Sequence, residues 1–403
     1  MNRVVLKPKR DYTVRRHHPW IFSGAIDERA STGLEATGLG ETVEVVSSEG
    51  EGLGFGAYSP ASQIRVRMLS FDSGRAPDAA FVEELVARAV GRRADFFAAA
   101  YTDGVRLVNA ESDALPGVVA DYYAGFVVCQ LTSAGAEFWR ETIVSALMKF
   151  APGCQGVAVR NDVEVRAKEG LPTEPAFAVL AGAQPPEVIE IREGEVRFLV
   201  DVRKGHKTGY YLDQREARRA VGALANGMEV LNCFAYTGGF GLFAEAAGAT
   251  KVTQVDISGE ALALAKRNAG LAHFCGTEME YVEADVFQYL RTCRDAGRKF
   301  DLIVLDPPKF AAVKSQVMKA ARGYKDINLL AMKLLKPNGI LATFSCSGAM
   351  TAELFDTVLA EAATDAKRDF QLLARTRQGA DHPVALGFPE GAYLKGVILR
   401  AMN

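Results

Sequence analysis

The stretch "MEVLNCFAYTGGFGLFAEAAGATKVTQVDI", residues 228–257, decides the fold. Its first run, "MEVLNCF", and its last run, "KVTQVDI", predict strands, and "GGFGLFAEAAGA" between them predicts a helix. A strand, a helix and a second strand imply a parallel pair joined by a right-handed crossover. The same alternation continues through "MEYVEADV", "FDLIVLDPP" and "GILATFSCS". We therefore predict an α/β fold whose C-terminal domain is a doubly wound parallel sheet.

The rest of the chain predicts two smaller domains before this sheet. Residues 1–72 carry short alternating runs such as "SQIRVRMLS", which are typical of a small β barrel or sandwich. Residues 73–187 combine helical spacing in "AAFVEELVARAVGRRADFF" with a hairpin in "GVVADYYAGFVVCQL", which predicts a central α/β domain. The stretch "EGLPTEPAFAVLAGAQPPE" predicts a linker to the sheet domain at 188–403. At the end of the chain, "FQLLARTRQ" and "YLKGVILRAM" predict an antiparallel pair.

Composition limits the classes of function. A chain of 403 residues, 49% of them hydrophobic, is long enough for several buried cores, and this composition argues against disorder. A net charge of −2 means that affinity for nucleic acid must come from local basic patches. The N-terminal stretch lacks the apolar run of a signal peptide, and no run is long enough to span a bilayer. The six cysteines show no metal-ligand spacing, so we predict free thiols, no metal site, no membrane partner and a cytoplasmic location.

Glycines and acids follow the first three strands of the predicted sheet, where ligands bind in open parallel sheets. Gly238 and Gly239 allow a tight turn and a close approach of the backbone to a ligand. Asp256 is placed to hold both hydroxyls of a ribose, and Asp285 to accept from an exocyclic amine. The glycines do not form G-x-G-x-x-G, so S-adenosylmethionine fits better than NAD. Taken singly, each residue has a structural alternative, a glycine turn or a helix cap.

Asp306 and Cys346 end the fourth and fifth strands, which are expected to be neighbours in the sheet. A thiolate that adds to carbon 6 of a pyrimidine turns carbon 5 into a nucleophile for a sulfonium methyl group. Asp306 would favour that addition by protonating ring nitrogen 3 of a cytosine or hydrogen-bonding to it. The alternative for Cys346 is a small buried hydrophobe, but its flanks in "SCSG" favour a loop tip. Cys233 lies within an apolar strand and is assigned to the core, and no residue is assigned as the base that removes the carbon 5 proton.

Long strings along essentially the whole chain carry a resemblance to a known family. They are "HHPWIFSGAI", "GLGFGAYSP", "ESDALPGVVADYY", "VRNDVEVRAKEGL", "GHKTGYYLDQREAR", "LNCFAYTGGF", "VLDPPKF", "FSCSG" and "ADHPV…FPEGAYLKG". On these strings the sequence resembles the bacterial large-subunit ribosomal RNA cytosine-C5 methyltransferases of the RlmI type. Its "HHPW" stands where the family pattern is "GHPW", a small change in a turn. The resemblance implies a PUA domain, a central α/β domain and a class I methyltransferase domain, with 23S ribosomal RNA as the substrate and a homodimer as one possible assembly.

The same resemblance implies roles for particular residues. Cys346 matches the nucleophile of the family. Gln214 and Arg215 of "YLDQR" are placed to reach the methionine carboxylate or the RNA. The implied contacts of S-adenosylmethionine are Tyr236, Thr237, Gly238, Gly239, Asp256 and Asp285.

Two basic segments are the predicted contacts with RNA phosphates. Their members are Arg3, Lys7, Lys9, Arg10, Arg15 and Arg16 near the N-terminus, and Lys309, Lys314, Lys319, Arg322 and Lys325 after Asp306. A solvated helix face is the alternative for each segment. Phe310 is a candidate surface for base stacking, and His382 is expected to be exposed, either lining the pocket or capping a turn.

The expected partner is ribosomal RNA, naked or in early assembly, because the target base must be flipped out or single-stranded. Three other functions stay open on the residues alone. They are methylation of uracil at carbon 5, methylation of an exocyclic amine with an inert Cys346, and RNA binding without catalysis as an assembly factor.

Overall fold

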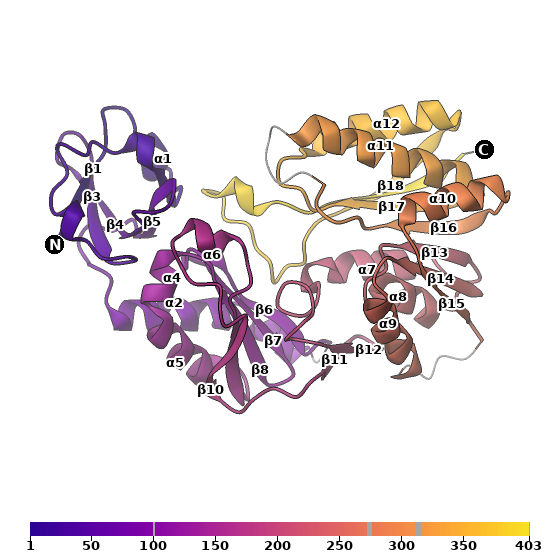
Figure 1. Ribbon diagram of the computed structural model, residues 1–403, viewed down its shortest axis with the longest axis horizontal. Helices are drawn as coiled ribbons and strands as arrows, with labels where there is room; N and C mark the ends of the chain where they lie inside the picture. Colours follow the sequence, from indigo (N-terminus) through magenta and orange to yellow (C-terminus); the bar gives the residue numbers. More distant parts are fainter. Residues whose placement is uncertain (100, 272–275, 311–315, 403) are drawn as a thin grey trace. The chain divides into compact units, whose positions relative to one another are not determined.

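The computed structural model describes residues 1–99, 101–271, 276–310 and 316–402, which divide into two compact units (Figure 1). The first unit comprises Met1–Arg192, Val200–Leu212 and Ala380–Gly391, and the second comprises Glu193–Leu199, Asp213–Gly379 and Ala392–Asn403. The first unit holds both smaller domains expected from the sequence, and their limits at 72 and 187 stay predictions. Within the described ranges, each helix is too short or too polar to cross a membrane.

The N-terminal part of the first unit is a five-stranded sheet in the order β1-β3-β4-β5-β2, which confirms the predicted small β domain. Inward-facing apolar side chains of these strands, such as Val43, Val45 and Val66, are fully buried in one core. The elements are β1 (Arg3–Val5), α1 (Tyr12–Arg15), β2 (Trp20–Phe22), β3 (Thr42–Val46), β4 (Gly52–Tyr58) and β5 (Ile64–Ser70).

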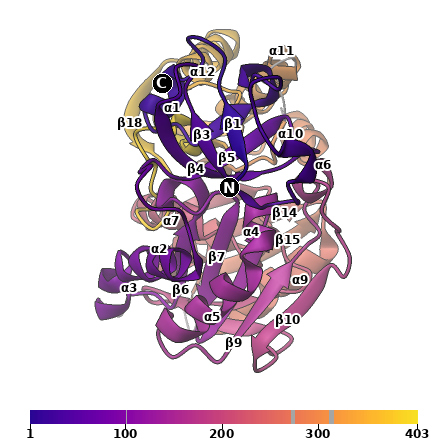
Figure 2. The same ribbon diagram turned by 90° about the vertical axis from the view of Figure 1, so that its left-hand side faces the viewer.

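The central part of the first unit is a second five-stranded sheet, in the order β10-β9-β8-β7-β6, with helices packed on it (Figure 2). The predicted hairpin is confirmed, because Val118 pairs with Leu131 in antiparallel register. The first long helix begins at Asp78, whose side chain accepts a hydrogen bond from Phe81 N and so caps it. The elements are α2 (Ala79–Gly91), α3 (Ala94–Ala98), β6 (Gly104–Asn109), β7 (Val118–Tyr123), β8 (Phe126–Leu131), α4 (Ala134–Phe138), α5 (Arg140–Phe150), β9 (Gly156–Arg160), α6 (Val165–Lys168) and β10 (Phe177–Gly182).

The prediction of a linker over residues 169–187 is wrong for its second half. Strand β10 lies there and pairs with β9 in antiparallel register, with Phe177 opposite Arg160. The prolines of the stretch lie on either side of the strand and do not interrupt it. An edge strand buries few side chains, and its pairing depends on the neighbouring strand, which local composition does not reveal.

The second unit contains a seven-stranded mixed sheet in the order β15-β14-β13-β16-β17-β19-β18, which confirms the doubly wound fold. The first five strands of that order are parallel, and β19 runs antiparallel to both β17 and β18. The predicted antiparallel pair at the end of the chain is therefore confirmed. The hairpin of β11 (Ile189–Glu193) and β12 (Val196–Val200) precedes the sheet.

Alternation along the strands sends side chains to two cores, one on each face of the sheet. Leu231, Cys233 and Leu305 face α10, α11 and α12, whereas Val230 and Val304 face α7 and α8. Figure 1 shows these two sets of helices on the two sides of the sheet. The elements are α7 (Arg215–Gly222), β13 (Glu229–Cys233), α8 (Gly239–Ala246), β14 (Lys251–Asp256), α9 (Gly259–Leu271), β15 (Glu278–Glu283), α10 (Val286–Asp295), β16 (Phe300–Leu305), α11 (Val317–Leu334), β17 (Leu335–Ser345), α12 (Ala352–Ala366), β18 (Phe370–Thr376) and β19 (Lys395–Ala401). The strand order reverses between β13 and β16, so a ligand is expected beyond their carboxyl ends.

Candidate active site

The loop from β13 to α8 has an unusual backbone at this reversal point. Phe234, Tyr236 and Gly238 have φ angles of 58°, 49° and 87°, in the left-handed region that costs a side-chain-bearing residue free energy. A Cβ on Gly238 would lie 2.8 Å from Gln254 Nε2 and 3.0 Å from Ala265 Cβ. Both the φ angle and the packing against Gln254 and Ala265 therefore require glycine at 238.

Asp256 is held in place by two backbone donors at the end of β14. Its Oδ2 accepts from Tyr236 N at 2.8 Å, and its Oδ1 accepts from Ser258 N at 2.9 Å. Each carboxylate oxygen keeps a second lone pair, so the group can still accept from the two hydroxyls of a ribose. The next residue, Ile257, is apolar and 72% exposed, and the sequence analysis did not single it out.

The remaining predicted cofactor residues after β13 and β15 have structural contacts. Asp285 caps α10, because its Oδ1 accepts from Gln288 N at 3.0 Å. Thr237 is buried, and its carbonyl accepts from Asn268 Nδ2 at 3.1 Å, while Gly239 begins α8. The cofactor contacts of these residues stay predictions.

Gln214 and Arg215 point to different partners. Gln214 Nε2 donates to Asp306 Oδ1 at 2.9 Å, so this side chain orients the carboxylate of the predicted catalytic residue. Arg215 is 1% exposed, with Nε 3.9 Å from the carboxylate of Glu193, which also forms two hydrogen bonds with Arg218 at 3.0 and 2.7 Å. The structure places Arg215 in a buried ionic cluster, and its contact with the cofactor or RNA stays a prediction.

Asp306 and Cys346 follow neighbouring strands, as the sequence predicts. Leu305 lies opposite Thr343 in the parallel pair of β16 and β17, and both Asp306 and Cys346 are half-buried. The hydroxyl of Tyr324, which is fully buried on α11, accepts from Ser345 Oγ at 3.0 Å. Burial raises the pKa of Tyr324 to about 12; the Ser345 bond opposes this shift, and negative charge on Cys346 and Asp306 adds to it. The catalytic candidates therefore both lie within electrostatic reach of this one hydroxyl, which the sequence analysis did not single out.

The other described cysteines lie in apolar surroundings. Cys129, Cys233 and Cys293 are at most 1% exposed, and burial raises the pKa of each thiol. The assignment of Cys233 to the core is confirmed. Cys154 is half-buried with its sulfur 3.7 Å from Met148 Sδ, and Cys275 lies outside the described residues.

Part of the predicted N-terminal RNA surface surrounds a hollow of about 410 Å³ in the β1–β5 domain. Lys9 and Arg10 line it together with Tyr12, Trp20 and Phe22, and the residues Tyr12 and Phe22 are 57% and 50% exposed. Cations beside exposed aromatic rings suit a stacked, single-stranded nucleotide.

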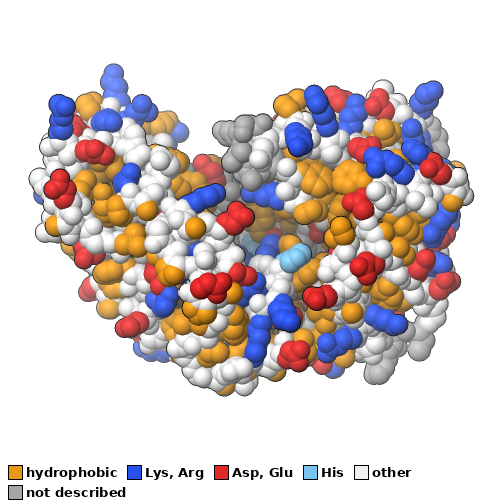
Figure 3. Space-filling view, viewed as in Figure 1, with side chains coloured by type: hydrophobic (Ala, Val, Ile, Leu, Met, Phe, Trp, Pro, Cys, Tyr) orange, Lys and Arg blue, Asp and Glu red, His pale blue; other side chains and the backbone are white. Residues whose placement is uncertain are grey.

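The other cations of that cluster differ in their contacts, and Figure 3 shows Lys and Arg side chains interspersed with acids over the surface. The Arg16 guanidinium lies 4.3 Å from the ring centre of Tyr12. Arg3 pairs with Glu44 at 2.9 Å, Lys7 Nζ donates to Gly24 O at 3.0 Å, and Arg15 pairs with Asp11 at 2.6 Å and with Glu51. The paired cations are less available to phosphate, so Lys9, Arg10 and Arg16 are the stronger candidates.

The second basic segment is also divided between open and engaged side chains. Lys309, Lys319 and Arg322 are exposed, whereas Lys325 pairs with Glu361 and Asp365 at 3.2 and 3.0 Å. Phe310 is half-buried and packs against Tyr324 and Phe287, with ring centres 4.8 and 6.1 Å away. Its predicted role in base stacking is untested, and Lys314 lies outside the described residues.

The prediction that His382 is exposed is wrong. His382 is 1% exposed, its Nδ1 lies 3.0 Å from Asp381 Oδ1, and Asp381 Oδ2 accepts from Arg106 N at 3.0 Å. The segment 380–391 belongs to the first unit, where it packs among residues nearly three hundred positions earlier. Local polarity suggests a surface loop and cannot reveal such a long-range contact.

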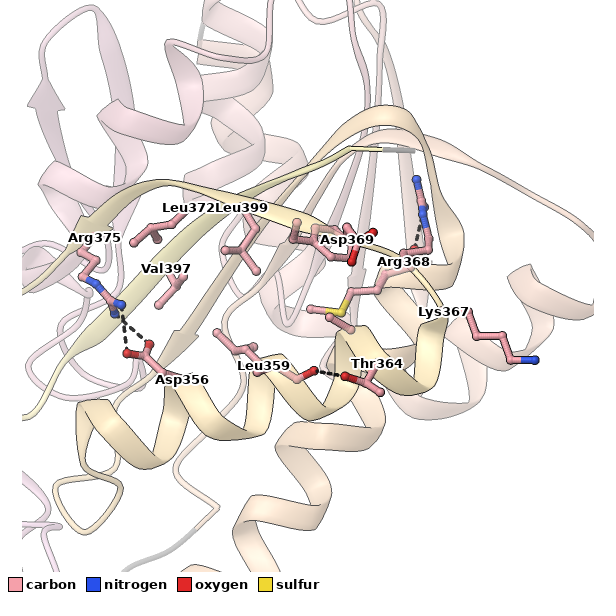
Figure 4. A pocket seen from close by; sticks show the side chains of 14 residues that line it. Asp356, Leu359, Thr364, Lys367, Arg368, Asp369, Leu372, Arg375, Val397 and Leu399 are labelled. Carbon is pink, nitrogen blue, oxygen red and sulfur yellow. Dashed lines mark hydrogen bonds and ion pairs between the residues drawn. The ribbon is translucent and has the colours of Figure 1, made fainter.

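A cavity of about 580 Å³ lies away from these residues, between α12 and the strands β18 and β19 (Figure 4). Its walls are mainly apolar, and Arg375 pairs with Asp356 across one end at 2.8 Å. It contains none of the predicted site residues. Within the described ranges, no group of three His, Cys, Asp or Glu side chains is placed to hold a metal ion.

The chain is similar to known methyltransferases over nearly its whole length. A family described as S-adenosylmethionine-dependent methyltransferase matches residues 160–390, and a PUA-like domain matches residues 4–71. Ribosomal RNA large subunit methyltransferase I of Shewanella amazonensis is 49% identical over 398 residues, which cover 99% of each chain.

Two solved structures share the fold. A candidate S-adenosylmethionine-dependent methyltransferase from Streptococcus mutans matches with a TM-score of 0.83 and 22% identity, over 99% of this chain and 100% of that one. A second candidate methyltransferase, solved with SAH, matches over the same shares of each chain with a TM-score of 0.84 and 23% identity. Together with the family matches, these structures confirm the PUA-like domain and the S-adenosylmethionine-dependent methyltransferase domain.

Proposed function

We propose that this chain, which belongs to the ribosomal RNA large subunit methyltransferase I family, methylates carbon 5 of a cytidine in large-subunit ribosomal RNA. One observation carries the choice of chemistry: a half-buried cysteine and an aspartate follow adjacent parallel strands, Cys346 after β17 and Asp306 after β16. A carboxylate alone would suit an exocyclic amine, but carbon 5 needs a nucleophile to activate the ring.

The edge of the sheet fits S-adenosylmethionine. The left-handed backbone at Gly238 turns the chain at the end of β13, and the oriented Asp256 carboxylate suits the two ribose hydroxyls. The exposed side chain of Ile257 offers an apolar surface to the adenine ring. When bound, the cofactor supplies a methyl group on a positively charged sulfur.

Cys346 and Asp306 act on the pyrimidine in the proposed mechanism. The Cys346 thiolate forms a bond to carbon 6, while Asp306 protonates or hydrogen-bonds to ring nitrogen 3 and so accepts the charge that moves into the ring. Gln214 holds Asp306 through the 2.9 Å hydrogen bond. Carbon 5 of the adduct takes the methyl group as the bond from that methyl to the sulfonium sulfur breaks, which leaves S-adenosylhomocysteine. Loss of the carbon 5 proton to a base then breaks the bond to the Cys346 sulfur and restores the thiolate, and a proton placed on ring nitrogen 3 is released.

The base that takes the carbon 5 proton is not Tyr324 in this scheme. Burial raises the pKa of Tyr324 to about 12, so its hydroxyl stays protonated near neutral pH and serves as a hydrogen-bond partner. A water molecule or Asp306 is left for this step.

The RNA must present an unpaired or flipped base to reach the thiol. For this reason we propose naked or early-assembly ribosomal RNA as the substrate. The exposed cations Lys309, Lys319 and Arg322 suit phosphates near the reacting strands, and the hollow beside Lys9 and Arg10 suits a single-stranded segment. A homodimer stays a prediction.

The test combines labelling with a trap. The protein is incubated with methyl-labelled S-adenosylmethionine and protein-free ribosomal RNA, and the labelled nucleoside is identified after digestion. A second RNA contains 5-fluorocytidine, in which fluorine replaces the carbon 5 hydrogen that a base must remove. The adduct with Cys346 should therefore persist and migrate as a covalent protein–RNA complex. Label in 5-methylcytidine and a trapped complex that is absent in Cys346→Ala would support the proposal.

Other outcomes identify the rival functions. Label in 5-methyluridine would keep the mechanism and change the base, and label on an exocyclic nitrogen that survives Cys346→Ala would remove the cysteine from the chemistry. RNA binding without label on any substrate would favour an assembly factor.

A further inference from the structure

Lys395 lies beside the loop that carries Cys346. It is the first residue of β19 and sits directly opposite Ser345, the last residue of β17, in the antiparallel pair. Residues directly opposite in such a pair have their side chains on the same face, with Cβ atoms about 5 Å apart. Lys395 is therefore fixed by the sheet at the point where β17 gives way to the Cys346 loop.

The ammonium group of Lys395 also binds the backbone of this loop. Its Nζ donates to Ser347 O at 2.7 Å, so Lys395 contacts the residues on both sides of Cys346, one by register and one by a hydrogen bond. The side chain is half-buried, which lowers the screening of its charge by water. Lys395 thus contributes both to the geometry of this loop and to the charge near Cys346.

The titratable groups near the thiol come from the segment after β16, from α11 and, with Lys395, from β19. Asp306 and Lys309 follow β16, and Tyr324 faces the loop from α11 through its bond to Ser345. Burial lowers the pKa of Lys395, charge on Cys346 opposes that shift, and Lys309 adds to it. This coupling is reciprocal, so an ammonium stabilised by a thiolate also stabilises that thiolate. Asp306 acts on Tyr324 in the same direction as Cys346 and so adds negative charge beside this loop.

We propose that Lys395 is a positioning residue that holds the Cys346 loop and keeps the thiol in its reactive, ionised form. This inference rests on the proposed role of Cys346 as the nucleophile. It adds the source of the charge that a neutral-pH thiolate needs, since thiolates are stabilised by a neighbouring cation. Nothing in the local sequence "YLKG" distinguishes this lysine, because the contact exists only when β17 and β19 are paired.

The test measures the reactivity of the Cys346 thiol without RNA or cofactor. Full-length protein is alkylated with iodoacetamide at a series of pH values, and the rate at Cys346 is followed by peptide mass spectrometry. Lys395→Met removes the charge and the hydrogen bond, Lys395→Gln removes the charge and keeps a donor, and Lys395→Arg keeps both. Lys333→Met, which removes an exposed lysine near the far end of α11, is the matched control.

We expect the midpoint of the rate profile to rise by about one pH unit in Lys395→Met and Lys395→Gln, with about tenfold slower alkylation at neutral pH. Lys395→Arg and Lys333→Met should keep the wild-type midpoint. A midpoint that does not move in the Met and Gln variants would overturn the proposal. A wild-type midpoint at or above about 8.5, which is the pKa of an ordinary cysteine thiol, would also overturn the proposal. This measurement needs no variant.

Folding and function are judged separately. Alkylation of Cys233, which is fully buried in the native sheet, reports a variant that has unfolded, and Lys395→Gln and the wild-type midpoint then decide. Alkylation needs no methyl transfer. If the target base is misassigned, the labelled nucleoside will differ from 5-methylcytidine, but the alkylation midpoint will still rise in the Lys395 variants that lack the charge. If the label is in 5-methylcytidine but the alkylation midpoint is the same in wild type and in the Lys395 variants, only the role of Lys395 is removed.

Discussion

Cys233 and Cys346 lie at the carboxyl ends of two parallel strands of one sheet and have opposite surroundings. Cys233 is the last residue of β13, is fully buried and packs in the core formed with α10, α11 and α12. Cys346 is the first residue after β17, is half-buried, and has Lys395 and Tyr324 nearby. A shift of one position relative to the strand end thus separates a packing residue from a candidate nucleophile.

Burial and neighbouring charge together distinguish the surroundings of the two thiols. Burial raises the pKa of the Cys233 thiol, because an apolar core disfavours the charged form. Past the end of the strand, Cys346 is half-buried, between Ser345 and Ser347, and Lys395 lies beside the loop. We therefore predict that the same residue type is inert in the strand and reactive beyond its end, and the following experiments test this contrast.

The largest expected effect is on methyl transfer. Cys346→Ala should lower the rate of label transfer to RNA by about 10³-fold or more, because the covalent route is lost. Cys233→Ala should keep the rate within about threefold and cost about 1 kcal/mol of stability from lost packing. Rates with labelled cofactor and urea unfolding curves measure the two quantities. Equal losses of activity in both variants would remove the contrast.

Asp306→Asn should have the next largest effect. The amide cannot deliver a proton to ring nitrogen 3, so we expect a loss of about 10²-fold in kcat with a smaller change in cofactor affinity. Gln214→Ala removes only the hydrogen bond to Oδ1 and should cost about tenfold. Single-turnover rates measure the effect on kcat, and cofactor titrations measure the effect on cofactor affinity. A larger loss of rate in Gln214→Ala than in Asp306→Asn would contradict the assignment of Asp306 as the catalytic group and Gln214 as its support.

Glu245 tests whether burial also raises the pKa of a carboxyl group, as it does for the Cys233 thiol. It is 6% exposed on α8, and burial raises its pKa to about 7 from 4.5. Between these two pH values the folded state holds a proton that the unfolded state has lost. The stability that comes from a neutral, buried Glu245 is therefore fully present below about pH 4.5 and is lost as the pH rises through about 7. Its size is up to about 3 kcal/mol.

Glu245→Gln mimics the neutral acid and should remove this loss. The variant should gain stability relative to wild type between pH 5 and pH 8, by urea unfolding at each pH. Since other acids titrate in both proteins, only the difference between the two curves is used. A constant difference across this range would show that Glu245 is charged in the folded protein.

The smallest expected effect concerns the N-terminal cations. Replacing Lys9 and Arg10 with Gln should reduce the salt dependence of RNA binding by about two ion equivalents, because both line the aromatic hollow. Arg15→Gln should change the slope little, because Arg15 already pairs with Asp11 and Glu51. Binding isotherms at several salt concentrations give the slopes. A larger effect at Arg15 would place the RNA on the other side of α1.

Much of the C-terminal sheet was predictable, because its signals are local. Strand and helix periods alternate from residue 228 onward, and the acids and glycines that follow the strands fall at one edge as soon as the strands are parallel. The positions of Asp306 and Cys346 after adjacent parallel strands were predictable for the same reason, and their catalytic role stays a prediction. The linker misread over 169–187 and the misplaced His382 share the opposite cause: β10 and the segment 380–391 are defined by partners distant in the sequence.

The sequence by itself determined the fold class, the cofactor class and the two residues proposed for catalysis, since each depends on a short run and its spacing. Only the tertiary structure decided which groups are free to act. It separated Arg15 and Lys325, held by acids, from exposed cations such as Arg10 and Arg322. It also brought Tyr324 and Lys395 to the Cys346 loop from α11 and β19. Burial and ionic pairing are properties of neighbours in space, and a linear pattern does not contain them.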